Sequence, residues 1–168
     1  MNERPNFLIT PKIYVGTYAK FNNGNLTGAW FDMRDFETAD DFYSEAKALH
    51  SDEADPELML LDFDGIPWRI FALGSIDEKF FEWLKLEDHE RELVEIYFDN
   101  IGGDDFDKII ESFAGTFDRE AEWAEEFLND TAEIPDHLVS YIDYEKYARD
   151  ADVNFVRHNG TFSAFYNF

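Results

Sequence analysis

The 168-residue sequence contains no cysteine, few basic residues and no long apolar run. Without cysteine, disulfide bridges, thiolate catalysis and cysteine-ligated metals are excluded. No apolar stretch approaches the roughly 18 residues that a membrane-spanning helix needs. Residues Met1–Pro11 also lack the apolar centre of a secretory signal peptide. We therefore expect a cytoplasmic protein that makes no contact with membranes.

Basic residues are the scarcest charged class, with 14 Lys and Arg against 38 Asp and Glu, which gives a net charge of −24. Hydrophobic residues make up 45% of the chain and aromatic residues 18%, which is too apolar for a disordered acidic tail. Self-repulsion at this charge destabilises a compact state. Some function other than stability must therefore favour the acids.

The acids are concentrated in the middle of the chain. Residues 32–152 carry 37 acids against 10 bases, whereas residues 1–31 and 153–168 together carry one acid and four bases. Strand-forming residues dominate the two ends and helical patterns dominate the acidic middle. The sequence therefore predicts an α+β fold.

The N-terminal third predicts a small sheet with one helix. Lys12–Ala19 and Thr27–Met33 are strand-like and flank the turn signal Asn22–Asn25, which indicates a hairpin. Thr38–Leu49 begins with a capping box and predicts a helix. Glu57–Phe63 predicts a third strand of the same sheet.

Beyond this sheet, Gly65, Pro67 and Gly74 mark a linker. The remaining predicted elements are a helix after the capping box at Ser75–Glu78, a helix over Asp88–Asn100, a short helix over Asp105–Ile110, a strand over Ser112–Thr116, a helix capped by Asp118, helices over Pro135–Ser140 and Asp143–Asp150, and a hairpin of Val153–Arg157 with Thr161–Tyr166.

The stretch Leu86–Asp107 holds nine acids against one base, Arg91. Four of its acids recur at helical spacing and form one stripe: Asp88, Glu92, Glu95 and Asp99. Like charges at this spacing cost roughly 0.2–0.5 kcal/mol per pair in an isolated helix. A solvated helix face is the alternative for one such helix, but the pattern recurs along the chain. The predicted binding surface comprises the outward carboxylates Asp40, Asp41, Glu45, Asp88, Glu92, Glu95, Asp99, Asp104, Asp105, Glu122, Glu125 and Glu126.

Patterns of catalytic or metal chemistry are weak. The four histidines are scattered, and His89–Leu93 lacks the second histidine of a zinc-protease helix. Asp62–Gly65 fails the spacing of a calcium-binding loop. There is no glycine-rich phosphate loop and no nucleophile elbow. We expect no enzyme activity, no metal and no cofactor, although so many carboxylates leave a carboxylate-based hydrolase as an alternative.

The sign of the charge predicts repulsion from nucleic acid and attraction to proteins that bind it. B-DNA carries one charge per ~1.7 Å of its axis, so 24 charges correspond to roughly 40 Å of duplex. A compact chain of this length has a diameter of roughly 40 Å. Its charge per unit length therefore resembles that of DNA. The alternative is an acidic, halophilic-type structural or interaction protein, in which charge serves solubility alone.

Two blocks near opposite ends of the chain resemble the signatures of the ArdA antirestriction family. The N-terminal block is Ile13–Phe31 (IYVGTYAKFNNGNLTGAWF), and the C-terminal block is Ile134–Asp150 (IPDHLVSYIDYEKYARD). Between them, residues 64–130 are similar in acidity and helical pattern. Asp88–Asp99 is our candidate for the short acidic-hydrophobic antirestriction motif of that family.

This resemblance implies a DNA mimic carried by mobile genetic elements, which inhibits Type I restriction-modification enzymes by occupying the DNA groove of the methyltransferase core. It also implies elongated homodimers with three small domains per chain, β-rich, all-helical and α/β. Our segmentation gives the same division, at residues 1–62, 63–103 and 104–168. The residues we expect at the dimer interface are Phe106, Ile109, Ile110 and Phe113.

Overall fold

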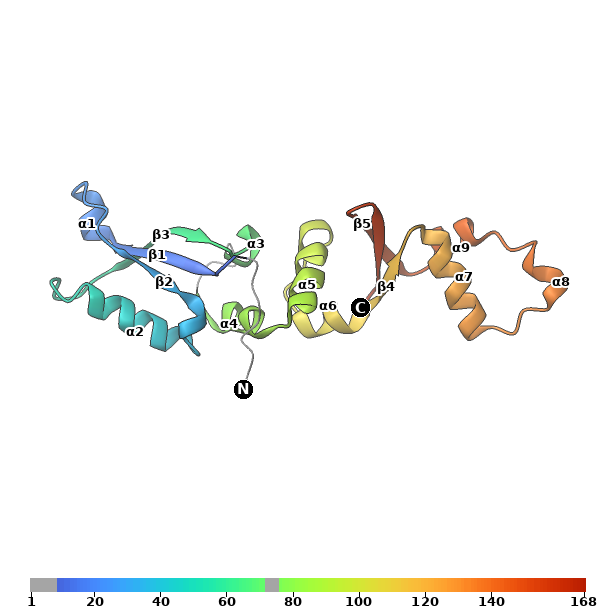
Figure 1. Ribbon diagram of the computed structural model, residues 1–168, viewed down its shortest axis with the longest axis horizontal. Coiled ribbons are helices and arrows are strands. Elements are labelled where there is room, and N and C mark those ends of the chain that lie inside the picture. The colour runs from blue at the N-terminus through green and yellow to red at the C-terminus, as the bar shows by residue number, and fades with distance from the viewer. Residues whose placement is uncertain (1–8, 72–75) are drawn as a thin grey trace. The chain divides into compact units, whose positions relative to one another are not determined.

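The computed structural model describes residues 9–71 and 76–168 of the chain, which divides into two compact units (Figure 1). Unit 1 covers Met1–Arg91 and unit 2 covers Glu92–Phe168. Each unit holds a three-stranded antiparallel sheet accompanied by helices, so the predicted α+β class is confirmed. The finer division into three domains stays a prediction.

Unit 1 is built on a sheet with strand order β2-β1-β3. Its elements are β1 (Lys12–Thr17), α1 (Tyr18–Asn22), β2 (Ala29–Asp32), the 3-10 helix η1 (Met33–Asp35), α2 (Ala39–Leu49), β3 (Leu58–Asp64), α3 (Trp68–Phe71) and α4 (Glu78–Lys85).

The predicted pairing of the first two strands is confirmed, but their connection is not a tight hairpin. β1 and β2 pair antiparallel from Lys12 opposite Asp32 to Val15 opposite Ala29. Tyr18 and Ala19, predicted as strand, instead begin helix α1. The strand ends because the Thr17 hydroxyl caps the helix by accepting the Lys20 N–H at 3.2 Å. β3 pairs with β1 on its other edge, as predicted.

The core of unit 1 lies between β1 and α2. Ile13, Val15 and Phe42 are fully buried, and the Phe42 ring meets the Phe31 ring edge-on at 5.8 Å. Helix α2 begins where predicted, because the Thr38 side chain accepts the Asp41 N–H at 3.2 Å. The helix thus combines a buried apolar face with an acidic first turn, which its dipole favours.

Helix α4 begins later than its sequence signal predicts. Its N-cap is Asp77, whose carboxylate accepts the Lys79 and Phe80 N–H groups. The predicted cap Ser75 and the linker residue Gly74 lie outside the described residues. The helix buries four apolar residues: Phe80, Phe81, Trp83 and Leu84.

Unit 2 is built on a second sheet, with strand order β4-β6-β5. Its elements are most of α5 (Asp88–Asn100), α6 (Phe106–Ser112), β4 (Phe113–Phe117), α7 (Glu120–Thr131), α8 (Asp136–Val139), α9 (Tyr144–Asp150), β5 (Val153–His158) and β6 (Thr161–Tyr166). In the described parts of both units, every helix is too short or too polar to cross a bilayer.

The central strand β6 is buried on both faces. Successive strand residues point to opposite faces of a sheet, and Ala164 packs with Trp123 of α7 while Phe165 meets Tyr97 of α5 at 5.1 Å between ring centroids. Phe165 also lies 5.5 Å from the Phe113 ring. Helices α5 and α7 therefore cover opposite faces of this sheet.

The C-terminal hairpin is confirmed. β5 and β6 pair up to His158 opposite Thr161, which leaves the two-residue loop Asn159-Gly160. Both loop residues have positive φ angles, 50° and 88°. This conformation suits the right-handed twist of a hairpin and favours an Asn-Gly pair.

Replacing Thr38 by alanine removes the cap of α2 and leaves the Asp41 N–H without its acceptor. We expect a loss of about 1 kcal/mol in the free energy of unfolding, measured by urea denaturation. Thr38→Ser keeps the hydroxyl and should retain most of the stability that the alanine variant loses. Equal stabilities of the alanine and serine variants would contradict the assigned cap.

Candidate partner-binding surface

Helix α5 presents carboxylates on one side and buries apolar residues on the other. Asp88, Glu92 and Asp99 are exposed, as the predicted stripe requires, whereas Glu95 is half-buried. The apolar side is wide, because it includes Phe98, which is buried with its ring 5.7 Å from the Phe106 ring. The acidic face of α5 is correspondingly narrow.

Arg91, the one base of this acidic stretch, is turned inward. Its side chain is 6% exposed and its guanidinium donates to the Leu86 carbonyl and to the Asp88 carboxylate. The predicted surface residue Asp88 therefore neutralises a buried cation as well as facing solvent. Glu90 accepts the Glu87 N–H at 2.8 Å and so helps to cap the helix.

Helix α7 carries acids and no bases. Glu125 and Glu126 are exposed as predicted, while Trp123 and Ala124 are buried on the opposite side. The sequence analysis omitted Glu120 and Asp130, which belong to the same helix and were detectable from the same acidic run. Five carboxylates thus lie within twelve residues of α7.

The start of α7 differs from prediction. The N-cap position is occupied by Arg119, with no side-chain cap, and not by Asp118. Glu122 instead reaches back to accept the Asp118 N–H at 3.1 Å and the Arg119 Nε–H at 3.2 Å. Glu122 is consequently half-buried, and part of its charge is paired within the chain.

The other predicted acids lie on two further elements. On α2, Asp40, Asp41 and Glu45 are exposed, and Asp41 accepts the Thr38 hydroxyl at 2.7 Å. Before α6, Asp104 is exposed, and Asp105 caps the helix and lies 3.3 Å from the Lys108 ammonium. The α2 acids belong to unit 1, and those around α6 belong to unit 2.

The four residues predicted at a dimer interface contribute to the core of unit 2. Phe106 and Ile109 are buried within the chain, at 2% and 0% exposure. Ile110 and Phe113 are half-buried, and Phe113 contacts the Phe165 ring. Their role in dimerisation stays a prediction.

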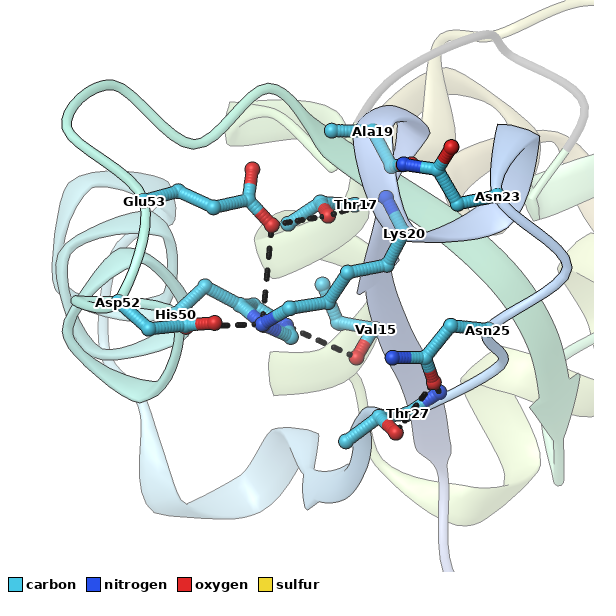
Figure 2. Close-up of polar contacts among 10 residues, drawn as sticks. All are labelled: Val15, Thr17, Ala19, Lys20, Asn23, Asn25, Thr27, His50, Asp52 and Glu53. Atoms are coloured by element: carbon cyan, nitrogen blue, oxygen red, sulfur yellow. Dashed lines mark hydrogen bonds and ion pairs between the residues drawn. The ribbon is translucent and has the colours of Figure 1, made fainter.

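A polar cluster that the sequence did not reveal joins the end of β1 to the loop after α2 (Figure 2). The Lys20 ammonium lies 2.8 Å from Asp52, 3.6 Å from Glu53 and 2.9 Å from Nδ1 of the buried His50. Because an ammonium only donates, Nδ1 is the acceptor of this hydrogen bond, while Nε2 of the same ring lies 3.4 Å from the Val15 carbonyl. The Thr17 hydroxyl donates to Glu53 at 2.6 Å.

The pKa shifts in this cluster are opposite to those of a catalytic pair. The hydrogen bond from Lys20 lowers the pKa of Asp52, and the same bond raises the pKa of Lys20. A general acid needs a raised carboxyl pKa and a lysine nucleophile needs a lowered one. The cluster therefore acts as a structural clamp and gives no support to the hydrolase alternative. Across residues 9–71 and 76–168, no three potential ligand side chains are arranged to hold a metal ion.

The comparisons with known proteins agree with the sequence resemblance. A family model described as Antirestriction protein (ArdA) matches residues 13–163 of the chain. The comparison with curated proteins gives no match. The residues that the family model matches include both acidic helices, α5 and α7.

Replacing Lys20 by methionine should destabilise unit 1 and change its response to acid. Because Lys20 lowers the pKa of Asp52 in the folded state, the stability from this pair is present above pH 3.8 and lost as the pH falls further. The stability difference between wild type and Lys20→Met should therefore narrow below about pH 4, measured by urea denaturation across pH. Lys47→Met removes an exposed lysine of α2 and is the matched control. A difference that persists unchanged to pH 3 would contradict the clamp.

Proposed function

The chain belongs to the ArdA antirestriction family, and from this premise we propose that it inhibits Type I restriction-modification enzymes as a DNA mimic. Family membership alone implies an antirestriction function. The proposal adds the mechanism, in which carboxylates of the chain take the place of DNA phosphates in the DNA-binding groove of the methyltransferase core. No covalent step and no cofactor takes part.

The carboxylate density of α7 is the observation that carries this proposal. At a rise of 1.5 Å per residue, its five acids span about 15 Å, or roughly one charge every 3–4 Å. One strand of B-DNA carries one phosphate per ~3.4 Å of its axis. The carboxylates of this single helix are thus spaced along its axis much like the phosphates of one DNA strand, with part of the Glu122 charge paired to Arg119.

The arrangement of the acidic helices within unit 2 also supports mimicry. Helix α5 and helix α7 cover opposite faces of the sheet, so carboxylates flank the unit on two sides. A DNA duplex likewise presents two phosphate strands. A groove lined by Lys and Arg gains affinity from such a partner, because its fixed cations are already placed for phosphates.

We also propose that the chain works as a homodimer. Two copies carry 48 negative charges by doubling the net charge of one chain, which corresponds to roughly 80 Å of duplex. The half-buried Ile110 and Phe113 are the parts of the predicted interface that retain exposed area. Phe106 and Ile109 would support that interface from within the unit.

The mechanism is tested by displacing a labelled duplex from a Type I methyltransferase core. If the chain and the duplex share one groove, the protein concentration needed for half-displacement should rise in proportion to the duplex concentration. Fluorescence anisotropy measures the bound duplex. A half-displacement concentration that is independent of duplex concentration would contradict competition for the groove.

Neutralising three exposed carboxylates should weaken binding to that core. In the variant Glu92→Gln, Glu125→Gln and Glu126→Gln, we expect affinity to fall by about 3- to 150-fold, since each exposed ion pair contributes about 0.2–1 kcal/mol. The salt dependence of binding should decrease with it. Calorimetric titration at several salt concentrations measures both.

The control for this variant changes the net charge by the same three units, through lysines added elsewhere. Ala19→Lys, Asn22→Lys and Thr116→Lys lie at exposed positions outside the acidic faces. At 0.15 M salt, charges are screened over about 8 Å, so these lysines should alter affinity less than the neutralised acids. Equal effects of the two variants would show that only net charge matters and would count against a placed phosphate mimic.

A further inference from the structure

The segment 132–143, here called the α8 arm, connects α7 to α9 and loops away from both helices (Figure 1). Its two ends bond to the flanking helices, with Ala132 N–H donating to the Leu128 carbonyl and the Asp143 carbonyl accepting the Tyr147 N–H. Between them the hydrogen bonds are internal: Leu138 N–H to the Pro135 carbonyl at 2.8 Å, and Tyr141 N–H to the Leu138 carbonyl at 3.0 Å. A helical turn thus orders the arm locally. The arm presents its side chains on a preformed backbone, which reduces the entropy lost on binding.

The arm exposes apolar side chains, unlike the acidic helices beside it. Tyr141 is 83% exposed, Leu138 45% and Val139 38%. Single exposed apolar residues are common on protein surfaces, but three within four residues on a projecting turn form a patch. Patches of this kind mark binding sites. Tyrosine in particular contributes a large contact area with few rotatable bonds.

The charge around the arm selects the class of partner. From Asp130 to Glu145 the chain has five acids and neither Lys nor Arg. Nucleic acids and anionic membranes would be repelled by these carboxylates. A second copy of the chain, with its own charge of −24, would be repelled at this place as well. The complementary partner is a basic protein surface.

We propose that the α8 arm inserts Tyr141 into an apolar pocket within the basic DNA-binding surface of the inhibited enzyme. This inference rests on the proposed function and adds an apolar contact to the electrostatic one. Enzymes that modify bases hold the extruded base among aromatic and apolar side chains, so a DNA-methylating enzyme has such a pocket inside its basic groove. The ring of Tyr141 would take the place of the base, while Asp136 and Asp143 lie in sequence on either side of it.

The experiment compares Tyr141→Ser with wild type in binding to a Type I methyltransferase core at several salt concentrations. Loss of a buried tyrosine anchor should weaken affinity by about 30-fold, by the same factor at every salt concentration. The slope of log Kd against log salt should stay unchanged, because the ring carries no charge. Tyr141→Phe should bind like wild type.

The matched control is Tyr18→Ser, which removes a 44%-exposed tyrosine of α1 in unit 1. It should leave the affinity unchanged. Because Tyr141 is mostly exposed, its variant should unfold at the wild-type temperature, and a scan of thermal unfolding checks this. Wild-type affinity of Tyr141→Ser, or an altered salt slope, would overturn the proposal.

Two further outcomes separate this inference from the proposed function. If Tyr141→Ser changes the oligomeric state in sedimentation, a second copy covers the arm and the proposal is overturned. If wild type displaces duplex from the core and Tyr141→Ser does so equally well, only the inference fails. If wild type does not bind the core, the proposed function fails and this inference fails with it.

Discussion

The burial of aromatic side chains against two small sheets is the interaction on which this chain depends. A net charge of −24 opposes compaction, and no disulfide holds the units together. In unit 2 the central strand is covered on both faces, by Trp123 on one and by Tyr97 on the other. Each aromatic ring removes a large apolar area from water. The free energy gained from this apolar burial offsets the repulsion among the surface carboxylates.

Two of the chain's bases, Arg91 and Lys20, lie where they stabilise the fold. Arg91 is turned into unit 1, where it neutralises Asp88 and binds a backbone carbonyl. Lys20 is only 15% exposed and joins two distant segments through His50 and the carboxylates after α2. Helix α7, by contrast, contains no base. These two cations thus contribute to the fold, whereas other bases, such as Lys108 and Arg149, are exposed.

Sequence reasoning succeeded where the determining signals are local. The capping residue Thr38, the Asn-Gly loop and the apolar spacing of α5 all act within a few residues, and these elements lie where predicted. It failed where contacts between residues far apart in the sequence determine the structure. The β1–β3 register, for example, pairs Thr17 with Leu58, 41 positions away. The Lys20 cluster likewise joins residues 30 or more positions apart.

The acidic surface was predictable in composition and less so in detail. Glu92, Glu125 and Glu126 are exposed as the helical spacing predicts, but Glu122 and Asp105 also serve as local caps or ion-pair partners. A carboxylate near a helix start has two possible roles, and the sequence does not rank them. The exposure of the α8 arm depends on how the other described segments pack around it. No local residue pattern specifies that packing.

The lack of bases on α7 has a kinetic consequence. An approaching cationic partner meets no cation on that helix and so experiences attraction from every charged side chain it carries. At 0.01 M ionic strength such a field extends about 30 Å from the surface, and fields of this kind raise association rates by roughly 10- to 1,000-fold. At 0.15 M salt the same field is screened over about 8 Å, so the association rate of a cationic partner should fall steeply as salt is added.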